Sequence, residues 1–288
     1  MNEPMKQLLA LLPIQYTLQG TELEHIEEIR LRKGHGIQLC YPHKTETLSA
    51  VADEDLMQTV LDRSTQRSPH AVREMLRRGF LILPGGHRLG ICGTGVYRQG
   101  SLMSLRDISS VNIRIARAAL GFGTRVADTL WERPGSALCM GPPGRGKTTL
   151  LRDVIRQLST RFGERICLID ERMEVAACLD GYPQFDLGPS TDVLSSVGKA
   201  EGIYMLTRSM NPSWIALDEI TAEEDVEAMI RSSYCGVRFL ATAHGRGLED
   251  LRRRPIYREL IDSGIFHHLF VIESDRRIRK EVLCCCVS

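Results

Sequence analysis

Gly141-Pro142-Pro143-Gly144-Arg145-Gly146-Lys147-Thr148 is the stretch that decides the fold of this 288-residue chain. It has the required residue at every fixed position of the phosphate-binding pattern G-x-x-x-x-G-K-[ST]. The apolar run 137–140 before it predicts a buried strand, and 147–160 after it has the spacing of a helix. Strand, glycine-rich loop and helix in this order indicate a binding site for a nucleoside triphosphate.

Each position of this loop has an expected task. Backbone N–H groups of the loop and the positive end of the helix face the same anion, so we expect 141–149, with Thr149 included, to hold ATP. Lys147 is expected to reach the β- and γ-phosphates, and the Thr148 hydroxyl is expected to ligate Mg²⁺. The cofactors that the pattern predicts are therefore ATP and Mg²⁺.

Two carboxylates close a later apolar run. Asp218 and Glu219 follow the predicted strand 214–217. Asp218 is predicted to hold Mg²⁺ through water, and Glu219 to orient and deprotonate the attacking water. A simpler interpretation stays open, in which the pair only caps a helix that begins near Thr221.

Weaker patterns add candidates to the same site. The run 170–174 ends another predicted strand, so Glu171 or Glu174 could reach Mg²⁺ or water, although a plain surface turn explains the run almost as well. His244 ends a fourth predicted strand, where an imidazole could sense the γ-phosphate. A lone histidine is more often structural, so the assignment of His244 rests on its position alone.

Composition excludes several classes of protein. The 37 basic and 36 acidic residues give a net charge of +1, which offers no field for nucleic acid or an anionic membrane. Residues 1–20 lack the unbroken apolar core of a signal peptide, and no apolar run is long enough to span a membrane. Nine cysteines without a C-x-x-C pair favour reduced thiols. We therefore expect a cytoplasmic protein with no nucleic-acid partner and no membrane insertion of its own.

The pattern of elements changes along the chain. Residues 1–120 mix short helices, at 2–12, 53–63 and 69–78, with alternating strands such as 28–32 and 37–41, which predicts a small α+β domain. Glycines and Pro134 punctuate 121–134, which we interpret as a linker. In 135–288 apolar strands alternate with helices, and 266–273 is predicted to be an edge strand that could pair with 279–284. The predicted fold class is α/β, with a mostly parallel sheet covered on both faces.

From about 133 to 247 the chain resembles the ATPases of type II and type IV secretion and pilus systems. The run 170–174 is similar to that family's Asp box, with Arg172 where the family usually has proline. The segment 206–212 is similar to its Leu-Arg-x-x-Pro-Asp segment, and Arg208 matches the arginine. The run 239–244 is similar to its His box. This resemblance implies a RecA-like P-loop domain, a catalytic role for Arg208 and a hexameric ring.

A closer resemblance, to the sporulation stage III AA family, covers essentially the whole chain. It rests on the runs 85–88, 170–172, 192–194 and 199–202. It implies an ATPase of the mother cell that works at the base of a membrane channel, peripheral to the membrane through its channel partners. Two alternatives stay open: a RecA-like ATPase stimulated by DNA, and a nucleotide-dependent switch with little hydrolysis, against which Glu219 argues.

The sequence also predicts a need for assembly. Within the P-loop domain Arg208 is the obvious cation for the charge that develops on the transferred phosphoryl group. Further donors are expected in the first half of the chain, among Arg88, Arg106, Arg114 and Arg117, although ordinary surface pairing explains most of them individually. Because such an arginine can accelerate hydrolysis by ~10³–10⁵, an isolated subunit should be slow and a homo-oligomer faster.

Overall fold

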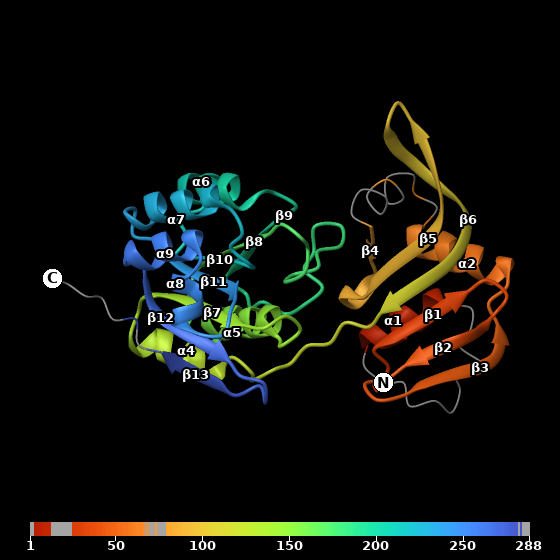
Figure 1. Ribbon diagram of the computed structural model, residues 1–288, viewed down its shortest axis with the longest axis horizontal. Coiled ribbons are helices and arrows are strands. Elements are labelled where there is room, and N and C mark those ends of the chain that lie inside the picture. Colours follow the sequence, from red (N-terminus) through yellow and green to blue (C-terminus); the bar gives the residue numbers. More distant parts are fainter. Residues whose placement is uncertain are drawn as a thin grey trace. The chain divides into compact units, whose positions relative to one another are not determined.

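The computed structural model describes residues 3–12, 25–66, 68, 73, 79–281 and 283. The chain divides into two compact units, each with its own sheet (Figure 1). One unit comprises Met1–Arg117 with Cys178–Gln184, and the other comprises Ala118–Ala177 with Phe185–Ser288. The helix predicted at 69–78 lies outside the described residues. None of the described helices is long and apolar enough to cross a membrane.

The first unit is built on a six-stranded antiparallel sheet with the order β3-β2-β1-β6-β5-β4. Its strands are β1 (Glu28–Arg32), β2 (Gly36–Cys40), β3 (Thr45–Val51), β4 (Leu81–Ile82), β5 (Arg88–Arg98) and β6 (Ser101–Arg114). Its helices are α1 (Glu3–Leu11), α2 (Glu54–Thr65) and the short η2 (Pro84–Gly86).

The alternating pattern of the sequence explains this sheet. In β1 the buried residues are Ile29 and Leu31, and in β2 they are Ile37 and Leu39. One face of each strand therefore packs in a core with α1 and α2, as period-2 alternation predicts. The strand β3 was not predicted, because its residues Thr45–Val51 are polar or half-exposed throughout. Beyond this core, β5 and β6 run on as a long hairpin (Figure 1).

The second unit contains a seven-stranded sheet with the order β13-β12-β7-β11-β10-β8-β9. All neighbouring strands are parallel except β12 and β13. The strands are β7 (Ser136–Gly141), β8 (Ile166–Asp170), β9 (Thr191–Ser195), β10 (Trp214–Leu217), β11 (Arg238–His244), β12 (Phe266–Ile272) and β13 (Ile278–Glu281). The helices are α4 (Thr124–Glu132), α5 (Lys147–Phe162), α6 (Lys199–Ser209), α7 (Glu223–Ser233), α8 (Leu248–Arg252) and α9 (Pro255–Asp262).

Helices cover both faces of this sheet. The helices α6, α7, α8 and α9 share one core with it, and α5 lies on the opposite face with α4 packed against it (Figure 1). The strands β7, β8 and β10 are buried at every residue, so they appear in the sequence as continuous apolar runs. The prediction of an α/β fold with a mostly parallel sheet, preceded by an α+β region, is confirmed.

Three details differ from the sequence analysis. The strand β12 is not at the edge, because β13 pairs with it on the side away from β7, in the pairing that the sequence analysis offered for 279–284. The strand β9 was not predicted, because its residues Thr191–Ser195 are mostly polar. The range 121–134, interpreted as a linker, contains α4, whose Trp131 stacks on Phe162 of α5 with ring centroids 4.6 Å apart. The division at 1–120 and 135–288 stays a prediction.

Candidate active site

The glycine-rich loop joins β7 to α5 at the carboxyl edge of the parallel sheet. Gly144 and Gly146 have φ values of 71° and 91°, in the left-handed region that favours glycine. Gly146 is also the residue before the first helical turn of α5. The backbone conformation of the loop therefore depends on these glycines. The N–H groups of the first turn of α5 have no partners within the helix. Such a terminus can bind an anion.

Lys147 begins α5, and the ammonium group of its buried side chain lies inside the site. Its Nζ donates to the carbonyl oxygen of Pro142 at 3.2 Å and lies 2.8 Å from His244 Nδ1. Burial lowers the pKa of Lys147, and the negative charges of Asp218 and Glu219 oppose that shift. The protein thus holds a partly desolvated cation at the loop, where a phosphate would compensate it.

Asp218 connects this loop to the strand β10. Its Oδ2 accepts a hydrogen bond of 2.7 Å from Thr148 Oγ1, and its Oδ1 accepts one from Thr242 Oγ1. Burial raises the pKa of Asp218, the two hydroxyl donors oppose the shift, and the charges of Glu174 and Asp170 add to it. A divalent cation beside Thr148 would favour the ionised form of this carboxylate.

Glu219 lies next to it and is held at several points. Its φ is 56°, unusual for a residue other than glycine, and its backbone N–H donates to Thr242 Oγ1 at 2.8 Å. Its Oε1 lies 2.7 Å from His244 Nε2, and its Oε2 lies 3.2 Å from Arg172 Nη1. Because His244 Nδ1 accepts from the Lys147 ammonium, Nε2 is the protonated nitrogen that donates to Glu219. A chain of hydrogen bonds therefore runs from the loop lysine to Glu219.

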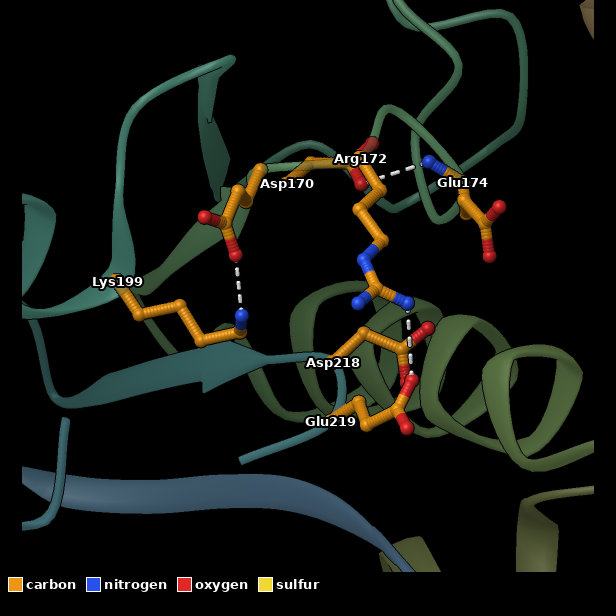
Figure 2. Close-up of a pocket in the computed structure, with 7 residues that line it drawn as sticks. Asp170, Arg172, Glu174, Lys199, Asp218 and Glu219 are labelled. Atoms are coloured by element: carbon orange, nitrogen blue, oxygen red, sulfur yellow. Dashed lines mark hydrogen bonds and ion pairs between the residues drawn. The ribbon is translucent and has the colours of Figure 1, made fainter. Parts of the chain in front are cut away.

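The loop after β8 forms the other wall of the site. Asp170 is buried and accepts three backbone hydrogen bonds of 2.8–3.1 Å, from Glu174, Val175 and Ala176. The buried Lys199 at the start of α6 forms an ion pair with Glu171. Arg172 reaches across the pocket to Glu219, as Figure 2 shows. Seven residues line this pocket: Asp170, Glu171, Arg172, Glu174, Lys199, Asp218 and Glu219.

The structure brings most of the predicted residues together. Lys147, Thr148, Asp218, Glu219 and His244 are linked by hydrogen bonds, and Glu171 and Glu174 line the pocket beside Asp218 and Glu219. Their convergence follows from the parallel strands, whose carboxyl ends meet at one edge.

Arg208 is the exception. The helix α6 starts at the pocket with Lys199 and leads back toward the start of β10, so Arg208, in its last turn, lies toward the opposite edge of the sheet. Arg208 is not among the residues that line this pocket, and its catalytic role stays a prediction. Arg172 and Lys199 are the cations among the seven residues that line the pocket.

Sequence reasoning gave no role in the site to Thr242, Lys199 or Arg172. Thr242 bridges Asp218 and the backbone of Glu219, and a threonine within the apolar run 239–243 was the available signal. Lys199 gave a weaker signal, because its partner Glu171 is 28 residues away in the sequence.

The residues present fit a nucleotide with Mg²⁺. The loop offers backbone donors and Lys147 for phosphate, and the Thr148 hydroxyl with the Asp218 carboxylate supplies oxygen ligands of the kind that Mg²⁺ prefers. Among the described residues there is no cluster of three or more His, Cys, Asp or Glu side chains that could hold a metal. Mg²⁺ would accordingly take most of its ligands from phosphate and water, as it usually does.

Comparison with known proteins places this chain in a family. The family model described as "Sporulation stage III, protein AA" matches residues 2–282. The chain belongs to this family. Stage III sporulation protein AA of Bacillus subtilis (strain 168) is 36% identical over 269 residues, which cover 92% of this chain and 86% of that protein.

Solved structures of other proteins share the fold of this chain. The ATPase DotB of Legionella pneumophila superposes with a TM-score of 0.60 at 15% identity, over 93% of this chain and 78% of DotB. The pilus retraction motor PilT, solved with bound ADP, gives a TM-score of 0.65 at 17% identity, over 94% of this chain and 82% of PilT. The fold is therefore that of RecA-like secretion ATPases, preceded by an antiparallel-sheet region.

Proposed function

We propose that the chain is a Mg²⁺-dependent ATPase of the secretion-motor type. The observation that supports this best is the contact between the glycine-rich loop and two distant segments. Thr148 is hydrogen-bonded to Asp218, 70 residues away, and Lys147 to His244, 97 residues away. A phosphate-binding lysine, a metal-binding pair and a carboxylate base thus lie within hydrogen-bonding reach of one another, which is the set that ATP hydrolysis requires.

Each residue then has a role in the proposed reaction. Lys147 and the loop N–H groups bind the β- and γ-phosphates, while Thr148 and, through water, Asp218 hold Mg²⁺, which neutralises charge on the phosphate oxygens. Glu219 takes a proton from the attacking water as the water oxygen bonds to the γ-phosphorus. The bond from that phosphorus to the β–γ bridging oxygen breaks, and its electron pair leaves with ADP.

His244 orients the base in this scheme. It donates to Glu219 from one nitrogen and accepts from Lys147 on the other. The hydrogen bond from Lys147 would therefore be lost when Lys147 moves to a phosphate. The presence of Glu219 at the end of β10, with its backbone fixed on Thr242, favours hydrolysis over a nucleotide switch.

At the level of the cell, we infer that this activity powers or assembles a membrane channel complex during endospore formation. Membership of the sporulation stage III AA family and a fold shared with DotB and PilT support this role. The protein would act in the cytoplasm of the mother cell, as a hexameric ring bound to channel components at the membrane. Arginines of the first unit, such as Arg88 and Arg114, would complete the site in such a ring.

The experiment is phosphate release from Mg-ATP across a range of protein concentrations, with light scattering on the same samples. We expect activity per subunit to rise as ATP drives assembly, and to rise further with the cytosolic parts of candidate channel proteins. Activity strictly proportional to concentration in a chain that stays monomeric would contradict the ring. Stimulation by DNA instead would favour the RecA-like alternative.

A further inference from the structure

The Arg172 side chain is fixed at its base and open at its tip. The three hydrogen bonds that Asp170 accepts from Glu174, Val175 and Ala176 stabilise the loop that carries Arg172. The Arg172 side chain nevertheless remains 61% exposed. Its guanidinium group therefore lies in the pocket on a stabilised loop, yet it is accessible to a ligand.

Arg172 uses little of its hydrogen-bonding capacity. Among the residues that the structure describes, Glu219 is its hydrogen-bond partner, through Nη1 alone at 3.2 Å. A guanidinium group carries several further N–H donors in a planar fork that suits phosphate oxygens. The other pocket cation differs, because Lys199 is buried and already paired with Glu171. Arg172 is therefore the better placed of the two to bind an incoming anion.

Both carboxylate oxygens of Glu219 have hydrogen-bond partners within the protein. One of its carboxylate oxygens accepts from His244 and the other accepts from Arg172. A carboxylate that is to take a proton from water needs a lone pair directed at that water. The contact with Arg172 occupies one lone pair of Glu219 Oε2, so its release leaves both lone pairs of that oxygen available to the attacking water.

We propose that Arg172 binds the γ-phosphate from within the same chain and couples ATP binding to the release of Glu219. This inference rests on the proposed ATPase function and adds a residue to it. The γ-phosphate competes with Glu219 for the guanidinium group. Its arrival transfers Arg172 to the phosphate oxygens, where the cation stabilises charge that develops during phosphoryl transfer. The same movement frees an oxygen of Glu219 for the attacking water.

In this mechanism Arg172 responds differently to ATP and to ADP, whereas an ordinary surface ion pair would not. ADP lacks the γ-phosphate, so it leaves Arg172 on Glu219, and ATP does not. Loss of Arg172 should accordingly affect the binding of ATP analogues and the rate of the chemical step, and it should leave ADP binding unchanged.

The test compares Arg172→Ala and Arg172→Lys with the wild type. A matched control is Arg231→Ala, because Arg231 is also exposed and ion-paired, to Glu227 on α7. For Arg172→Ala we expect kcat to fall at least about tenfold with a smaller change in KM. Affinity for a non-hydrolysable ATP analogue should fall severalfold, and ADP affinity should stay within about twofold. Arg172→Lys should recover part of kcat, and Arg231→Ala should match the wild type.

Several results would overturn the proposal. Wild-type kcat in Arg172→Ala would make the contact a surface ion pair, and a higher kcat would make it only an inhibitory latch on Glu219. Equal loss of ADP and analogue affinity with a lower melting temperature would show a structural role. An inactive wild type would contradict the proposed function instead, and the comparison of ADP with the analogue would still decide whether Arg172 binds the γ-phosphate.

Discussion

The two edges of the seven-stranded sheet are formed by opposite ends of the same strands. At one edge an ion pair stabilises the protein, whereas at the other edge two charged groups are buried at a cost in stability. At the amino edge, Glu164 accepts two hydrogen bonds from Arg238 Nη2, at 3.2 and 3.0 Å. The Arg238 guanidinium also lies over the Trp214 ring, 4.5 Å from its centroid. Both charged groups at this edge therefore have strong partners within the chain.

At the carboxyl edge burial disfavours the charged forms. Burial is the largest cause of the lowered pKa of Lys147 and of the raised pKa of Asp218. Neither charge is fully compensated by the protein, and Mg²⁺ and phosphate are the groups that would compensate them. The comparison teaches that the Glu164–Arg238 pair stabilises one edge, whereas Lys147 and Asp218 at the other edge are held at a cost in stability for the sake of a ligand.

The largest contrast is expected in nucleotide affinity. Lys147→Ala removes the loop cation directed at the β- and γ-phosphates, and we expect ATP affinity to fall at least about a hundredfold. Arg238→Ala, at the other end of the sheet, should keep ATP affinity within about twofold, because its partners Glu164 and Trp214 lie at the amino edge. Titration with a fluorescent ATP analogue measures both. Affinity within about threefold of the wild type in Lys147→Ala would break the comparison.

The second contrast concerns pH. Because the pKa of Asp218 is raised, its carboxylate takes up a proton at a higher pH than an ordinary aspartate, and a protonated carboxyl holds Mg²⁺ poorly. The Mg²⁺ concentration for half-maximal activity should therefore rise as the pH falls, beginning above the usual aspartate pKa. In Asp218→Asn the remaining activity should be low and should lose this dependence. A Mg²⁺ requirement that is independent of pH in the wild type would argue against the role of Asp218.

The smallest contrast is in thermal stability, and it has opposite signs at the two edges. A carboxyl group whose pKa is higher in the folded than in the unfolded state makes the folded protein less stable as the pH rises through that pKa. Ionised Asp218 therefore destabilises the protein without nucleotide at neutral pH. Asp218→Asn should raise the melting temperature there. Glu164→Gln weakens a half-buried ion pair, so it should cost about 1 kcal/mol and lower the melting temperature by ~2–4 °C. Scanning calorimetry without nucleotide measures both, and shifts of the same sign would contradict the account.

The sequence predicted the carboxyl edge well for a physical reason. The loop 141–148 has a fixed spacing, β8 and β10 are runs of buried residues with polar residues at their carboxyl ends, and β11 ends in His244. Parallel pairing then brings Asp218 and His244 to the loop without any further information.

The remaining features depend on contacts that no local pattern records. The position of Arg208 depends on the direction of α6, and the position of Lys199 depends on an ion pair with Glu171. Whether β12 is an edge strand depends on its pairing with β13. The grouping of Cys178–Gln184 with the first unit is also a tertiary property, in which Gln184 Oε1 accepts from Gly85 N at 2.9 Å.

The central claim, that the carboxyl edge hydrolyses ATP, is tested most directly by Glu219→Gln, with ATP binding and phosphate release measured on the same samples. The amide occupies the same space but cannot take a proton from water. We predict ATP affinity close to that of the wild type and phosphate release reduced at least about a hundredfold. Glu164→Gln, at the amino edge, serves as the matched control and should release phosphate at the wild-type rate. Phosphate release by Glu219→Gln at the wild-type rate would contradict the account.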